Sequence, residues 1–145
     1  MAISRAALLV IRLHGLVFRW TGGRVGGRLG HLEQVLFTTT GRTTGHARTT
    51  PLAVTVVGDK LVLIASAGGA DRDPGWYRNL VAHPDVVVQR GAVPRPMRAR
   101  TAEGDERVEL WAAAVANNPG YAGYQTKTTR PIPVVVCEPR DPGPK

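Results

Sequence analysis

Short β-branched segments separated by tight turns constrain the fold of this chain more than any other feature of its sequence. Residues 35–40 and 48–57 have the composition of two strands, the second interrupted only by Pro51. The turn Gly58–Asp59 then leads into a third strand at residues 60–66, a spacing typical of a β-hairpin. Strands that follow one another through hairpins predict an antiparallel sheet.

The rest of the chain alternates further strands with helices inserted late. Asp73 is a good N-cap for a short helix over residues 74–82, with Pro74 at its first position. Residues 103–118 predict an amphipathic helix that buries Val108, Trp111, Ala112 and Val115. Further strands are expected at 86–90, 94–101 and 133–138. This order favours an α+β fold, a small antiparallel barrel.

Charge is distributed unevenly along the 145 residues, a length that fits one domain. The net charge is +8, and seven of the sixteen arginines lie in the first 48 positions against one acidic residue, Glu33. This asymmetry predicts an anionic partner. The one cysteine, Cys137, cannot form an internal disulfide, which favours a reducing, cytoplasmic location and a buried, unreactive thiol.

Residues 3–20 are apolar with helical periodicity, and their arginines, spaced seven apart, share one face. A membrane span is disfavoured because Arg12 would lie near the bilayer centre. Two interpretations remain: an amphipathic helix at the inner face of the cell membrane, or a helix packed on the domain or on a second copy. Nucleic-acid binding is not expected, because only the net charge favours it.

The chain therefore divides into three parts. Residues 1–31 hold the N-terminal helix and a flexible, glycine-rich connector at 22–30, residues 32–139 hold the folded domain, and residues 140–145 are a disordered tail rich in proline and glycine.

Residues 41–48 combine glycines, hydroxyl groups and two arginines between two strands. Glycine lets backbone N–H groups approach a ligand, and the guanidinium groups of Arg42 and Arg48 suit bidentate contact with phosphate or carboxylate. An anion site and a hairpin turn with solvated arginines are both consistent with this segment.

Residues that would catalyse a reaction unaided are missing. The four histidines are far apart without ligand spacing, so no metal site is expected, and neither a Ser-His-Asp pattern nor a carboxylate pair is visible. A binding role remains, or a reaction whose difficult step belongs to a bound cofactor.

Three further segments fit a flat, anionic ligand. Small residues at Ser66–Gly69 would let a ring approach the backbone, and the helix after Asp73 offers N–H donors. Tyr121 and Tyr124 lie three apart on one helical face, and Arg130 could close the site electrostatically. The aromatic and helical residues are also explained by core or helix packing, and Arg130 by an ordinary exposed arginine.

Taken in order, the motifs TTTGR-x-x-G-x-x-R, AS-x-GG-x4-PGWYRNL and Y-x-x-Y-Q-x-x-T-x-R-x-IPVVV-x-EP resemble the deazaflavin-dependent nitroreductase family. Its members use coenzyme F420 and are also described as F420-dependent quinone reductases. The resemblance covers roughly residues 32–139. It implies a split β-barrel of six mostly antiparallel strands with flanking helices, and hydride transfer from reduced deazaflavin to a quinone, nitroaromatic or other electron-poor acceptor. Many members carry an N-terminal helix that touches the membrane.

The resemblance also assigns roles to matching residues. Gly41, Arg42, Thr43 and Arg48 match positions near the cofactor's phosphate and acidic tail. Ala65, Ser66, Ala67, Gly68 and Gly69 match a strip beside the deazaflavin ring, and Trp76, Tyr77 and Asn79 match a helix that borders the cofactor. Ser66, Tyr121 and Tyr124 match the catalytic, substrate-facing side chains.

This chain departs from the family pattern at three positions. Relatives commonly have a basic residue at the position of Thr43, a lysine at that of Ala67 and, in nitro-reducing members, a tyrosine at that of Asn118. An alternative function is a non-catalytic split barrel that carries a lipid or another flat cofactor at a membrane surface. Split barrels often dimerise, so a homodimer is a further expectation.

Overall fold

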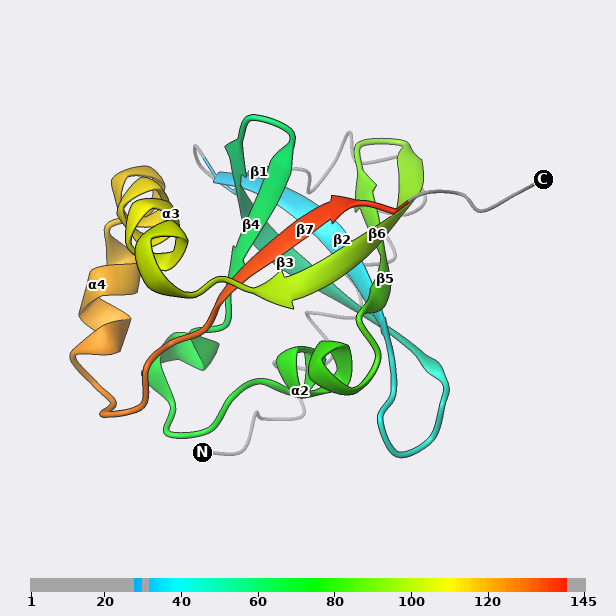
Figure 1. The fold of residues 1–145 in the computed structure, drawn as a ribbon, viewed down its shortest axis with the longest axis horizontal. Coiled ribbons are helices and arrows are strands. Elements are labelled where there is room, and N and C mark those ends of the chain that lie inside the picture. The colour runs from blue at the N-terminus through cyan, green and yellow to red at the C-terminus, as the bar shows by residue number, and fades with distance from the viewer. Residues whose placement is uncertain (1–27, 30–31, 141–145) are drawn as a thin grey trace.

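The computed structural model describes residues 28–29 and 32–140 (Figure 1). Its strands are β1 (Arg28–Leu29), β2 (Leu32–Thr40), β3 (Ala47–Val57), β4 (Lys60–Ile64), β5 (Asp85–Arg90), β6 (Val93–Thr101) and β7 (Val134–Pro139). The helices are η1 (Ala67–Gly69, a 3-10 turn), α2 (Gly75–Ala82), α3 (Gly104–Asn117) and α4 (Gly120–Gln125). The predicted helix at 3–20 and the tail at 141–145 lie outside the described residues.

Six strands form a closed antiparallel barrel. The sheet runs β2-β3-β4-β7-β6-β5, and β5 returns to β2 through the pairs from Leu36↔Gln89 to Thr38↔Val87. Closure leaves these six strands without a free edge over the paired residues. The predicted split barrel is confirmed. Within the predicted connector over 22–30, the two residues of β1 pair with Leu32 and Glu33 of β2.

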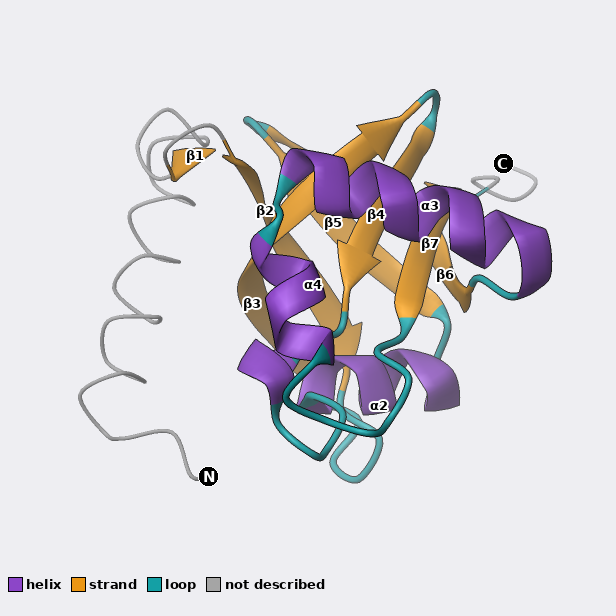
Figure 2. Cartoon of the chain, turned by 90° about the vertical axis from the view of Figure 1, so that its left-hand side faces the viewer, coloured by secondary structure: helices purple, strands orange, loops and turns teal. Residues whose placement is uncertain are grey.

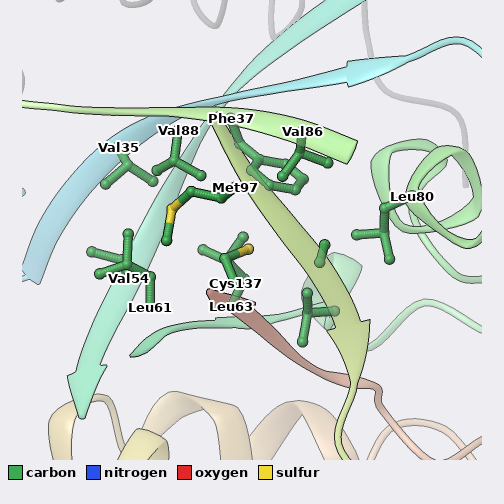
Figure 3. Close-up of a cluster of buried hydrophobic side chains, with 12 residues drawn as sticks. Val35, Phe37, Val54, Leu61, Leu63, Leu80, Val86, Val88, Met97 and Cys137 are labelled. Atoms are coloured by element: carbon green, nitrogen blue, oxygen red, sulfur yellow. The ribbon is translucent and has the colours of Figure 1, made fainter. Parts of the chain in front are cut away.

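The barrel interior is an apolar core (Figure 3). Alternate residues of β2 point inward, so that Val35 and Phe37 are both 0% exposed. They pack with inward residues of the other strands and with one residue of α2: Val54, Leu61, Leu63, Leu80, Val86, Val88, Met97, Ala99, Val135 and Cys137. Burial raises the pKa of the Cys137 thiol to about 12, so the thiol stays protonated and unreactive, as predicted.

A second apolar cluster lies outside the barrel, where α3 and α4 cover one side of it (Figure 2). The outward residues of β4 and β7 meet Leu110 and Ala114, which face the barrel from successive turns of α3. The predicted buried face of this helix is therefore partly wrong. Val108 is 70% exposed and Ala112 is exposed, while Trp111 and Val115 are partly buried.

The start of α2 differs from its prediction as well. Pro74, in an extended conformation, occupies the N-cap position, and no side-chain capping bond is present. The carboxylate of Asp73 accepts a hydrogen bond from Arg130 instead, at 2.8 Å. Within the described part of the chain, no helix combines the length and apolar character needed to cross a membrane.

Candidate active site

A pocket of about 260 Å³ lies where β3, β4, α2 and α4 converge on the outside of the barrel. One part of its lining is polar or aromatic: Gln34, Ser66, Trp76, Asn118, Tyr121 and Tyr124. The other part is apolar and comes from two neighbouring strands: Pro51, Leu52, Ala53, Leu63 and Ile64. A concave site with an apolar wall and a few polar groups is the usual form of a small-molecule site.

Helix α4 contributes two aromatic rings to the pocket. The centroids of Tyr121 and Tyr124 lie 6.4 Å apart with an interplanar angle of 63°. Tyr121 is 7% exposed, and burial raises the pKa of its phenol, against the opposing effect of a hydrogen bond with Asn118. At neutral pH this phenol is therefore a hydrogen-bond donor. The ammonium of Lys127 lies 5.6 Å from the centroid of the Tyr124 ring and adds a cation at this side.

The predicted strip at residues 65–69 follows β4 directly. Ala65 is fully buried, Ser66 lines the pocket, and Ala67 and Gly68 are exposed. Ala67, Gly68 and Gly69 have φ angles of 47°, 66° and 87°, a left-handed turn that is unusual for an alanine. A Cβ on Gly69 would lie 2.9 Å from the carbonyl oxygen of Tyr124, so only glycine lets the strip pack this closely on α4.

Helix α2 borders the pocket through Trp76 alone. The Trp76 ring meets Phe37 edge-on at a centroid distance of 5.5 Å, which fixes its orientation against the core. Tyr77 was predicted to border the cofactor, but its hydroxyl hydrogen-bonds Thr101 of β6 at 2.8 Å and it does not line the pocket. Asn79 is 6% exposed and is bonded within the protein.

The β2–β3 loop carries the predicted anion-binding residues. A backbone hydrogen bond of 2.8 Å from the Gly41 N–H to the carbonyl of His46 closes the loop. The side chain of Arg42 donates a hydrogen bond to the buried Asn79 of α2, and Arg42, Thr43 and Arg48 are all exposed. The side chain of Arg48, which pairs through its backbone with Thr39, has no hydrogen-bond or ion-pair partner among the described residues. These residues lie apart from the pocket lining, so the site has two parts, a pocket and a basic loop.

Several lining residues escaped the sequence reasoning. Gln34 is the polar one, and the apolar residues of β3 and β4 were identified only as parts of strands. Asn118 also lines the pocket, and the sequence pointed to it only as the position of a tyrosine in nitro-reducing relatives. Gln34 alternates with the inward Val35, which places it on the outer face, and this position was available from strand periodicity. Although Gln34 is 6% exposed, its carboxamide makes no hydrogen bond with any residue in the described ranges.

A second, larger hollow of about 540 Å³ lies along the outer face of β3 and α3. It is bounded by Glu33, Arg90, Asn117 and residues 54–57, and none of the motif residues lines it. The smaller pocket is the better candidate because it gathers the strip, Trp76 and both tyrosines. The described part of the chain contains no group of histidine, cysteine and acidic residues that could hold a metal ion.

Comparison with known proteins shows the family of this chain. The family described as F420H(2)-dependent quinone reductase matches residues 10–139. An F420H(2)-dependent quinone reductase of Mycobacterium tuberculosis (strain ATCC 25618 / H37Rv) is 40% identical over 131 residues, which cover 88% of this chain and 88% of that protein.

Two solved structures have the same fold. The F420-H2 dependent reductase FDR-A is 46% identical with a TM-score of 0.68, over 72% of this chain and 93% of its own. A structure described as a domain-swapped dimer is 38% identical with a TM-score of 0.71, over 93% of this chain and all of its own (100%). These likenesses give no support to the non-catalytic carrier. The chain belongs to the F420H(2)-dependent quinone reductase family, and it is an oxidoreductase whose cofactor is coenzyme F420.

Proposed function

We propose that this protein transfers a hydride from reduced F420 to a quinone held in the pocket beside Tyr121 and Tyr124. The observation that carries the proposal is the convergence of two separate motifs on one pocket. Ser66 and Trp76 come from the second motif and the tyrosine pair from the third, more than 40 residues further along the chain, yet all four side chains line the same pocket.

The residues present fit a deazaflavin. A flat ring needs a wall without protruding side chains. Gly68 and Gly75 both border open space, because a Cβ added to either would have no other atom within 4 Å. Trp76 and the apolar residues of β3 offer stacking area, while exposed Arg42 and Arg48 suit an anionic tail. Ser66 and the backbone of the strip would hold the ring, and the arginines would hold the tail.

When bound, the reduced cofactor supplies the hydride from its C5 position. The task of the protein is then to orient the acceptor and to stabilise the negative charge that develops on its oxygen. Tyr121 keeps its proton at neutral pH and can donate a hydrogen bond to that oxygen. Pro51, Leu52 and Trp76 line the pocket and would shield a bound ring from water, and solvent would supply the proton.

The proposal favours quinones over nitroaromatics. Asn118 stands where nitro-reducing relatives have a tyrosine, which removes one aromatic donor from the acceptor side. Cations are also missing at Thr43 and Ala67. Lys127 partly replaces the cation that is missing at Ala67, because its side chain packs beside the strip. A Cβ added to Gly69 would lie only 2.9 Å from the Cβ of Lys127.

Two further proposals concern partners and place. A homodimer is supported by the solved relative described as a domain-swapped dimer. Peripheral contact of residues 3–20 with the inner face of the cell membrane is supported by their arginine spacing. Co-sedimentation of the full chain with anionic vesicles, compared with a chain lacking residues 1–27, tests the membrane contact. Equal sedimentation of the two chains would contradict it.

The experiment that tests the function is an anaerobic assay of F420H2 oxidation by a naphthoquinone and by a nitroaromatic. We expect turnover with the quinone, and a loss of about tenfold or more in kcat/KM for Tyr121→Phe because a transition-state hydrogen bond is removed. Val81→Ala, at a 62% exposed position of α2, is the control and should behave as wild type. Binding of F420 without turnover of any quinone would contradict the proposal.

A further inference from the structure

Arg130 is bonded to the first two residues of the strip at 65–69 and to Ala70, which follows it. Its guanidinium donates to the carbonyl oxygens of Ala65 at 3.3 Å, Ser66 at 2.9 Å and Ala70 at 2.8 Å. It also pairs with the carboxylate of Asp73 at 2.8 Å, just before α2. The side chain is only 13% exposed, so its charge is directed inward rather than toward a ligand at the surface.

The segment that carries Arg130 is itself fixed to the helix of the two tyrosines. The carboxamide of Gln125, at the end of α4, donates to the carbonyl of Arg130 at 2.8 Å. It also accepts the N–H of Ile132 at 3.0 Å. Through Gln125 and Arg130, the position of α4 and the position of the strip are therefore set by one connected group of hydrogen bonds.

Peptide geometry gives this arrangement a consequence for the ligand. In a trans peptide the N–H points opposite to the C=O of the preceding residue, and the described residues contain no cis bond. Because the carbonyls of Ala65 and Ser66 point at the guanidinium, the N–H groups of Ser66 and Ala67 point away from it. Neither N–H donates to a protein acceptor within the described ranges.

The turn at residues 67–69 also needs stabilising contacts from outside it. Ala67 is the one residue other than glycine with a positive φ among the described residues, a conformation that an alanine does not favour. The bonds from Arg130 span this turn on both sides, at Ser66 before it and at Ala70 after it. They are charge-assisted, which makes them stronger than neutral hydrogen bonds.

We propose that Arg130 is a positioning residue for the cofactor. By holding three carbonyls of residues 65–70, it presents the N–H groups of Ser66 and Ala67 to the bound deazaflavin and sets the distance between the strip and the tyrosine pair. This inference rests on the proposed function of the pocket. It replaces the expectation that Arg130 closes the site by its charge, because Asp73 already neutralises that charge.

The test measures the Kd of F420 and the KM values of both substrates in Arg130→Lys, Arg130→Ala and Asp73→Asn. A lysine cannot reach three carbonyls with its single ammonium, so we expect the Kd of F420 to rise about tenfold or more in Arg130→Lys and further in Arg130→Ala. The KM for the quinone should change less than the KM for F420H2. Added guanidinium ion, at concentrations below those that unfold the wild type, should restore part of the affinity of Arg130→Ala.

Arg107→Met is the matched control. Arg107 also donates to a carbonyl of the segment before β7, that of Ile132 at 2.8 Å, but it touches no residue of the strip. It should lose thermal stability without losing F420 affinity, and guanidinium should not change its binding. If Arg130→Ala does not fold, the Kd of F420 in Arg130→Lys and in Asp73→Asn decides whether Arg130 has the positioning role.

The outcomes separate this inference from the function on which it rests. If wild type does not bind F420, the proposed function fails. If wild type binds and the folded Arg130 variants bind equally well, or if Arg107→Met loses affinity to the same degree, the positioning role is overturned.

Discussion

The side-chain oxygen of Asn79 accepts two hydrogen bonds from Arg42, one from its backbone N–H at 3.2 Å and one from its guanidinium at 2.8 Å. The amide nitrogen of Asn79 donates to the hydroxyl of Thr39 at 3.1 Å. One buried carboxamide thus connects α2 to the end of β2 and to the basic loop that follows it. Asn79 holds the proposed anion-binding loop in place.

Replacing Asn79 with alanine should therefore act on the loop and on the fold together. We expect a loss of about 1–3 kcal/mol in the free energy of unfolding, because the buried hydroxyl of Thr39 loses a partner. The Kd of F420 should rise, because Arg42 is no longer held. Chemical denaturation and fluorescence titration measure the two effects.

Tyr77→Phe is the control for this change, since it removes a hydrogen bond from the same helix on the side facing β6. Its stability should fall by about 1 kcal/mol with F420 affinity unchanged. If Tyr77→Phe weakened F420 binding as much as Asn79→Ala does, displacement of the basic loop would not explain the weaker binding.

Arg48→Ala should weaken F420 binding far more than it alters the fold. Arg48 is exposed, and its side chain makes no ion pair or hydrogen bond with a described residue, so its truncation costs the folded state little. A lost contact with an anionic tail should raise the Kd several-fold at low salt, and the difference from wild type should shrink as salt is added. Unchanged affinity at low salt would remove Arg48 from the site.

Gln34→Leu separates ligand contact from stability. The carboxamide of Gln34 faces the pocket without a described protein partner, so an apolar side chain of similar size should leave the melting temperature unchanged or raise it. We expect kcat/KM for the quinone to fall about tenfold if a polar contact to a ligand is lost. A drop in stability with normal turnover would mean that the residue serves the fold.

Acid stability should depend on Glu106. Hydrogen bonds from Arg100, and secondarily from Lys60, lower the pKa of Glu106 from 4.5 to about 2. Because the unfolded chain binds this proton more tightly than the folded one, the stabilisation is complete above pH 4.5 and disappears as the pH falls toward 2. Melting curves of Glu106→Gln should show a weaker pH dependence across this window. A pH dependence identical to wild type would contradict the assignment.

The strands were predictable from sequence because their signals are local. β-branched composition and the Gly58–Asp59 turn gave the β3–β4 hairpin to within a residue or two, and β3 continues through Pro51, opposite Leu36. The order of the strands favoured a small antiparallel barrel, but it did not show which strands close it, since the pairing of β2 with β5 joins residues about 50 positions apart. The split-barrel type came from the family resemblance.

The errors arose where long-range partners override local preference. Asp73 is a good capping residue, but its carboxylate accepts a hydrogen bond from the guanidinium of Arg130 and does not cap α2. The face of α3 was misjudged because Leu110 and Ala114 together fit the barrel more closely than Val108 does. In the site, Ser66, Trp76 and the tyrosines were found from motifs, whereas Gln34 and the role of Arg130 needed the three-dimensional contacts.

The most direct measurement of the central claim is a titration of the purified full chain with F420, following the fluorescence of its tryptophans. Trp76 lines the pocket beside the strip, so a ring bound there should quench it. We predict a saturable decrease at micromolar cofactor that is largely lost in Trp76→Phe. The absence of any saturable change in the wild type at micromolar cofactor would contradict the account.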